Sequence, residues 1–243
     1  MELDFQTNLF ISLIICLCTI SQAIFGVGIL LWGTPALMLL NYNFIETLGI
    51  LLPVSLIVSC LQFAPNYSQI DFSFIVKFMK FSICGLIIGL LIVILIPLNL
   101  EVVAAFMLFI TFLMRRDQAS PRLKFLISKH DTLFMFFLGF SHGVSNLGGS
   151  LLVARLSLNK YSSDQYRATV AAAYSVFAAS QLIILFSTIG KLTVSVNYIL
   201  LATCFYLLTT KFFVKRIEPK LFHSFISAFI LILALFLVLK SLI

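Results

Sequence analysis

The chain has 243 residues, of which 61% are hydrophobic and only 10% are charged, and its mean hydropathy is +1.14. Soluble domains carry about 25% charged residues, so this composition excludes an ordinary water-soluble protein and predicts an integral membrane protein. The net charge of +7 would suggest a nucleic-acid ligand in a soluble protein. In a membrane protein, basic loop residues report topology instead, and we expect no nucleic-acid partner.

The first apolar run extends from Phe5 to Ile45 without a charged residue. A helix rises about 1.5 Å per residue and the hydrocarbon core of a bilayer is about 30 Å thick, so this run is about two crossings long. Gly26 and Gly28 weaken a helix near its middle, and we expect the chain to turn back there. The length of the run leaves open whether it forms a full hairpin or a re-entrant loop.

Later apolar segments each predict one membrane helix, at 45–65, 72–97, 98–114, 164–189, 193–213 and 219–242. A further segment, 131–158, contains the stretch GFSHGVSNLGGSLLVAR, in which glycines and polar side chains interrupt the apolar sequence. We expect this segment to enter the membrane, break near Gly148 and Gly149, and return to the same face. The hydrophilic segment 115–130 is predicted to be a basic linker.

The distribution of basic residues supports the re-entrant interpretation of 131–158. Lysine and arginine concentrate in cytoplasmic loops. If 131–158 were a simple crossing, the 16 Lys and Arg would divide almost evenly between the two faces. If it re-enters, all of them except Lys191 and Lys240 share one face. We therefore expect a multi-pass protein of the inner (plasma) membrane, with the linker in the cytoplasm.

An internal repeat is indicated by a shift of about 120 residues, which aligns SQAIFGVGILLWGTPAL with SHGVSNLGGSLLVARLS. Ser21 then meets Ser141, and Gly28 meets Gly148. The predicted fold is an all-α polytopic membrane protein with two inverted repeats, each a broken or re-entrant helix element followed by three transmembrane helices. The repeats comprise 1–114 and 131–243. Secondary transporters share this plan and bind substrates where broken helices meet near the midplane.

The stretches FGVGILLWGTPALMLL and GVSNLGGSLLVARLSL, duplicated in a chain of this length, resemble the TauE/SafE sulfite exporter family. The resemblance covers essentially the whole chain. It implies a membrane transporter that exports a small anion, such as sulfite, an organosulfonate or an organic acid. Pro35 in the first stretch is replaced by Arg155 in the second, and the glycine runs are shorter than in the family pattern, which leaves the substrate open.

A break in a membrane helix frees backbone N–H groups, and the new helix N terminus carries a partial positive charge of about +0.5 e. Two such ends predict an anion site without a dedicated charge. The candidate substrate-binding residues are Ser21, Gln22, Gly26, Gly28, Ser141, His142, Ser145, Asn146, Gly148, Gly149 and Arg155.

Each of these residues also has a simpler interpretation. Glycines allow close helix packing, and Arg155 either extends to the surface or acts as a counter-charge at the inner vestibule. His142 either titrates and couples transport to protons or hydrogen-bonds between helices. Tyr174 and Gln181 are interpreted as contacts between helices, with a role in lining the path as the alternative.

Two functions other than transport remain open. The stretch GFSHG fits G-x-S-x-G, but that motif requires a strand-to-helix turn. An intramembrane serine protease would instead need Ser141 paired with His223. A non-transporting accessory membrane protein is the other alternative. We expect no enzyme, no cofactor and no metal site; the expected partners are a small anionic substrate and the lipid bilayer, and the composition is compatible with a homo-oligomer.

Overall fold

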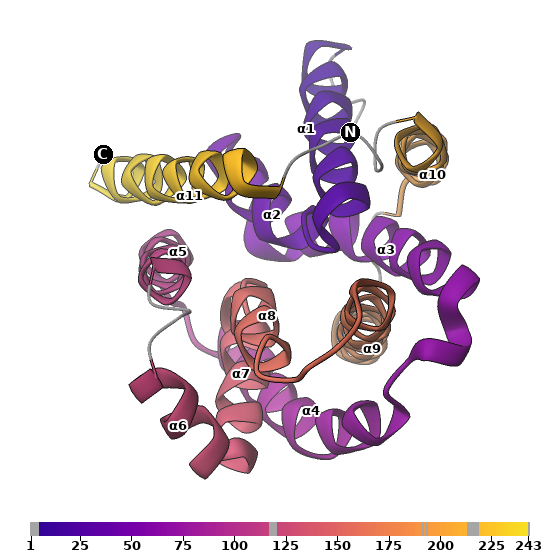
Figure 1. The fold of residues 1–243 in the computed structure, drawn as a ribbon. Coiled ribbons are helices and arrows are strands. Elements are labelled where there is room, and N and C mark those ends of the chain that lie inside the picture. The colour runs from indigo at the N-terminus through magenta and orange to yellow at the C-terminus, as the bar shows by residue number, and fades with distance from the viewer. Residues whose placement is uncertain (1–4, 117–120, 191, 193, 213–218, 243) are drawn as a thin grey trace.

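The computed structural model describes residues 5–116, 121–190, 192, 194–212 and 219–242, and within them every element is a helix. Lys191, which the sequence places on the less basic face, lies outside these residues. The elements are α1 (Phe5–Phe25), α2 (Ile29–Leu39), α3 (Phe44–Phe63), the 3-10 helix η1 (Ala64–Gln69), α4 (Phe72–Leu95), α5 (Leu100–Arg116), α6 (Pro121–Lys129), α7 (Asp131–Ser145), α8 (Gly149–Leu156), α9 (Ser163–Ile189), α10 (Val196–Phe212) and α11 (Pro219–Ser241) (Figure 1). The all-α prediction is confirmed.

Both predicted interruptions are present. The chain breaks between α1 and α2 at residues 26–28, as the glycines predicted. The second break lies at 146–148, slightly earlier than predicted, because Asn146 adopts the left-handed conformation and ends α7. With 11 and 8 residues, α2 and α8 are about 16 and 12 Å long, roughly half of the hydrocarbon core or less. Each short helix therefore suits a re-entrant element.

The segment between α5 and α7 contains the helix α6, which was predicted only as part of the linker 115–130. α6 mixes basic residues with a short apolar group, so its composition looked like that of a loop. Ile127 is buried, whereas Phe125 on the same helix is exposed. Ile127 thus packs α6 against the bundle, where α6 contacts α7.

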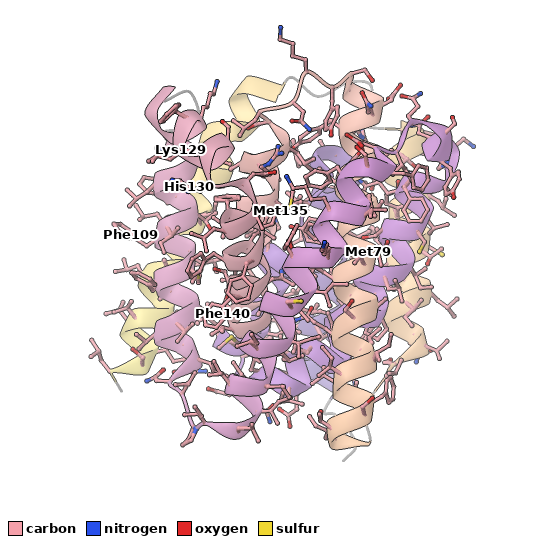
Figure 2. All side chains as sticks on the ribbon, turned by 90° about the horizontal axis from the view of Figure 1, so that it is seen from below. Met79, Phe109, Lys129, His130, Met135 and Phe140 are labelled. Carbon is pink, nitrogen blue, oxygen red and sulfur yellow. The ribbon has the colours of Figure 1, made fainter. Side chains whose placement is uncertain are left out.

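The outer surface of the bundle is apolar. Four helical segments are long and apolar enough to cross a membrane, namely Gln6–Phe25, Phe44–Gln69, Phe72–Leu95 and Ser163–Ile189. Large hydrophobic side chains are exposed along the bundle, among them Val76, Ile183 and Leu200, and Phe109 projects from its side (Figure 2). Exposing apolar surface to water costs about 25 cal/mol per Å². Lipid is the solvent that suits this surface.

The closest helix pair is α4 with α7. Gly85 and Gly89 of α4 face the backbone of α7, and Gly139 and Gly143 of α7 face the backbone of α4. Side chains at these positions would overlap carbonyl oxygens of the partner helix. Both helices therefore carry a G-x-x-x-G spacing, which lets membrane helices approach closely. The remaining main contacts join α1 with α10, α3 with α9, and α5 with α11.

Contacts between distant residues show which helix ends lie together. The Tyr198 hydroxyl donates to Asn8 Oδ1 at 2.8 Å, which joins the starts of α10 and α1. This contact lies near the end of α9, which leads into α10. Near the start of α9, the Asp71 amide donates to Thr169 Oγ1 at 3.1 Å. On the same side, Lys77 of α4 pairs with Asp131 at the start of α7. Because α9 connects these two ends of the bundle, α1 and α7 start from opposite ends.

Candidate functional site

The two helix breaks have the same local geometry. Gly26 (φ 83°) and Asn146 (φ 61°) each take the left-handed conformation directly after a helix. The amide of Gly26 donates to Gln22 O at 2.8 Å, and the amide of Asn146 donates to His142 O at 2.7 Å. Glycine and asparagine are the residues that tolerate this conformation best. The correspondence of Gly26 with Asn146 follows the shift of about 120 residues seen in the sequence.

Gly28 and Gly148 let the returning helix lie against the helix that precedes it. A Cβ atom on Gly28 would come within 2.5 Å of Cys18 O, and one on Gly148 within 2.7 Å of Leu138 O. Both oxygens belong to the backbone, so neither can move aside cheaply. These glycines therefore serve helix packing here, and their contact with an ion stays a prediction.

Polar side chains at the first break hydrogen-bond one another. Gln22 Nε2 donates to Ser59 Oγ at 3.1 Å, and Gln22 Oε1 accepts from the amide of Ile29 at 3.2 Å, which satisfies one free N–H of α2. Trp32 Nε1 donates to Ser21 Oγ at 3.0 Å. Ser21 and Gln22, both predicted site residues, thus link α1 to α2 across the first break by hydrogen bonds.

The second break is tied to the first half of the chain. Asn146 Nδ2 donates to Thr34 Oγ1 of α2 at 2.8 Å, and both side chains are buried. The Ser145 hydroxyl donates to Ser141 O at 2.7 Å and accepts from the amide of Leu147 at 3.2 Å. The predicted residue Asn146 therefore meets the first half in the interior, through Thr34, which was not among the predicted residues.

Several buried groups beside the second break have no hydrogen-bond partner among the described residues. These are both ring nitrogens of His142, Asn146 Oδ1, the Tyr174 hydroxyl and both amide atoms of Gln181. The His142 ring stacks on Phe177 with centroids 4.0 Å apart. Sequence reasoning interpreted Tyr174 and Gln181 as contacts between helices. Their spacing of seven residues, two helical turns, was the signal that they share a face of α9 with Phe177.

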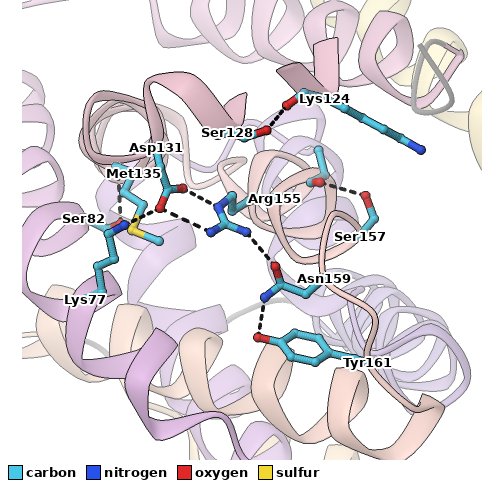
Figure 3. Close-up of polar contacts among 11 residues, drawn as sticks. Lys77, Ser82, Lys124, Ser128, Asp131, Met135, Arg155, Ser157, Asn159 and Tyr161 are labelled. Atoms are coloured by element: carbon cyan, nitrogen blue, oxygen red, sulfur yellow. Dashed lines mark hydrogen bonds and ion pairs between the residues drawn. The ribbon is translucent and has the colours of Figure 1, made fainter. Parts of the chain in front are cut away.

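Arg155 lies away from this polar group, in the last turn of α8. Its guanidinium pairs with Asp131 and donates to Asn159 Oδ1 at 3.2 Å (Figure 3). Arg155 is half-buried, and its charge is neutralised by Asp131, which the sequence reading did not name as a partner. If 131–158 returns to the face from which it starts, its two ends must be neighbours, and that signal could have identified the pair.

The same network extends to the start of α4. Asn159 Nδ2 donates to the Tyr161 hydroxyl, which donates to Asp71 Oδ2 at 2.6 Å. Burial, followed by the hydrogen bond to Asp71, raises the pKa of Tyr161 to about 12. Burial would raise the pKa of Asp71, but hydrogen bonds from Ser73, Tyr161 and the amide of Phe74 lower it below its ordinary value. The network fastens α8 and the chain after it to α4 and α7.

The G-x-S-x-G spacing of the protease alternative has a structural explanation. Gly139 and Gly143 are the α7 glycines that face α4, so the motif serves helix packing, and no strand precedes it in the described chain. His223 lies in α11, and its side chain falls outside the described part of the protein.

A comparison with protein families matches residues 11–237 to the model described as "Sulfite exporter TauE/SafE". The chain belongs to the TauE/SafE sulfite exporter family. The match runs from α1 into α11 and includes both helix breaks. Comparisons with curated proteins and with solved structures give no match. Membership assigns this TauE/SafE protein to a class of membrane anion exporters rather than to an enzyme class.

Proposed function

We propose that this TauE/SafE protein exports a small oxyanion, sulfite or an organosulfonate, across the inner membrane by alternating access around its two helix breaks. The observation that carries the proposal is the hydrogen bond between Asn146 at the second break and Thr34 in α2. It supports a meeting of two broken elements that start from opposite ends of the bundle. Such a meeting is where secondary transporters bind ions and substrates.

The proposed architecture is a pair of inverted repeats, 1–114 and 131–243, joined by the linker 115–130. Equivalent helices support it by their contacts: α4 packs on α7 as α10 packs on α1, while α3 contacts α9 and α5 contacts α11. A two-fold axis in the membrane plane would produce this pattern. The two repeats then rock against each other, opening the breaks first to one side and then to the other.

The proposed orientation places the starts of α4, α7 and α9 in the cytoplasm. Apart from Lys191 and Lys240, the Lys and Arg residues belong to segments on that side in this topology. Lys240 lies at the other end, where it pairs with Glu101 at 2.9 Å. The positive-inside tendency supports this orientation, and with it an N terminus on the outer side.

Transport is tested with purified protein reconstituted in liposomes, by measuring the initial rate of sulfite flux against sulfite concentration. A carrier predicts saturation, inhibition by competing sulfonates, and no flux in protein-free liposomes. An imposed pH gradient tests coupling: acceleration by the gradient that disappears in a His142→Gln variant would assign the coupling to His142. Absence of flux for sulfite and sulfonates, with folded protein in the membrane, would contradict the proposal.

A further inference from the structure

The two helix breaks differ in how the polar side chain at one equivalent position is hydrogen-bonded. At the first break, both amide atoms of Gln22 have hydrogen-bond partners within the protein. At the second, His142 occupies the position equivalent to Gln22, and its ring nitrogens have no partner. Buried polar groups in proteins are nearly always hydrogen-bonded, so a cluster of unpartnered ones indicates a ligand or ordered water.

Unpartnered buried amide atoms occur in both halves of the described chain, since Gln62 beside Gly26 has no hydrogen-bond partner for either amide atom, but a phenol is among the unpartnered groups only in the second half. The shift of about 120 residues aligns Tyr174 with Val54 and Gln181 with Leu61. The first half therefore has apolar side chains where the second half has a hydroxyl and an amide. Tyr174, His142 and Gln181 are all at most 1% exposed. The Tyr174 hydroxyl, which has no counterpart at Val54, therefore distinguishes the second break from the first and indicates binding there.

Among these groups, the Tyr174 hydroxyl lies at the N terminus of α8. A Cβ atom on Gly149, the first residue of α8, would overlap the Tyr174 hydroxyl oxygen, so this hydroxyl lies directly against the helix N terminus. The His142 ring lies 6.4 Å from the Tyr174 ring between centroids, and the Gln181 side chain lies beside His142. Free N–H groups of the helix end and a phenol thus lie together, and the imidazole and the amide are their neighbours.

The chemistry of the cluster favours a singly charged oxyanion. Tyr174 and the amide of Gln181 are neutral donors, and Arg155 of the broken element is already paired with Asp131. Without a charge to neutralise the ligand, the desolvation cost of a dianion, which grows with the square of its charge, is far larger than that of a monoanion. Gln181 Oε1 can also accept a hydrogen bond from the hydroxyl of a protonated oxyanion.

We propose that the transported anion binds at the second break, as a singly charged oxyanion held by Tyr174, Gln181 and His142 at the N terminus of α8. This inference rests on the proposed transport function. It makes Tyr174 and Gln181 substrate-binding residues.

The test is calorimetric titration of the purified protein with sulfite, methanesulfonate and sulfate in one mildly acidic buffer, where sulfite is mostly hydrogensulfite. Each lost hydrogen bond to a charged ligand weakens binding by about tenfold or more. We expect that loss for Tyr174→Phe and for Gln181→Leu, and no lower Tm for ligand-free Tyr174→Phe, because the Tyr174 hydroxyl has no hydrogen-bond partner among the described residues. The matched control is Tyr198→Phe, whose hydroxyl binds Asn8 far from the breaks. Sulfate should bind at least about tenfold more weakly than hydrogensulfite.

The outcomes separate the inference from the proposed function. If wild-type protein binds and transports sulfite and both variants bind it like wild type, the inference is wrong and the function stands. The same holds if the variants lose ligand-free Tm without losing affinity, since the groups would then be structural. If sulfate binds as tightly as hydrogensulfite, the monoanion site is wrong. If wild-type protein neither binds nor transports any of these anions, the proposed function itself fails.

Discussion

Replacing Gly89 by alanine tests whether close contact between α4 and α7 holds the second broken element in place. The added Cβ would lie 2.5 Å from Phe140 O and 3.1 Å from the amide nitrogen of Val144, both backbone atoms of α7. Ordinary contacts at such positions begin at 3.4 Å, so the helices must separate by about 1 Å. Overpacking of this kind costs about 1–3 kcal/mol, and rigid backbone on both sides favours the upper end.

The matched control is Gly33→Ala in α2. There the added Cβ would meet the two terminal methyl carbons of Leu51 at 2.9 Å, and these can rotate away. Both substitutions gain similar helix propensity, about 1 kcal/mol, so the difference between them reports the helix contact. Thermal unfolding in detergent should show Gly89→Ala several degrees below wild type and Gly33→Ala close to it. Equal Tm values for the two variants would refute the reasoning.

Three further predictions concern polar contacts. Asp131→Asn removes the carboxylate that neutralises half-buried Arg155 and should lower the free energy of unfolding by about 2 kcal/mol, measured by chemical denaturation. Gln22→Leu leaves the buried amide of Ile29 without its acceptor and should cost about 1–3 kcal/mol by the same measurement, in contrast to Tyr174→Phe. The pKa of Asp71 is lower in the folded protein than its ordinary value of 3.8, so the ionised carboxylate stabilises the fold above pH 3.8, and this stabilisation is lost as pH falls through the folded pKa. The free energy of unfolding of Asp71→Asn, measured by chemical denaturation, should therefore fall less steeply than that of the wild type over this acidic range.

Much of the fold was predictable because membrane helices are constrained by length and hydrophobicity. The breaks near Gly26 and Gly28 and near Gly148 followed from glycine positions, and the asymmetry of basic residues predicted that the two ends of 131–158 lie on one side, as the Arg155–Asp131 pair shows. The exact end of α7 was less accessible, since it depends on the left-handed conformation of Asn146, a residue that also occurs inside helices. Helix α6 was missed because its mixed composition resembles that of a loop.

The positions of the helix breaks were predictable, whereas the contacts of the polar residues beside them were less so. Ser21 and Gln22 were grouped with the binding residues, yet the structure gives them partners within the protein. Hydrogen-bond satisfaction depends on which helices meet, and one sequence does not show that Ser59 faces Gln22. Conversely, Tyr174 and Gln181 resembled ordinary helix contacts until their partners proved to be absent among the described residues.

Counterflow measures the central claim, carriage of an oxyanion by alternating access, most directly. Liposomes containing the wild-type protein are loaded with unlabelled sulfite and diluted into buffer with a trace of labelled sulfite. Alternating access predicts that the label accumulates transiently above its outside concentration, because the excess unlabelled sulfite inside competes with the label for the inward-facing site and slows its exit. Label that only equilibrates would indicate a channel, and label that never enters would contradict transport of sulfite.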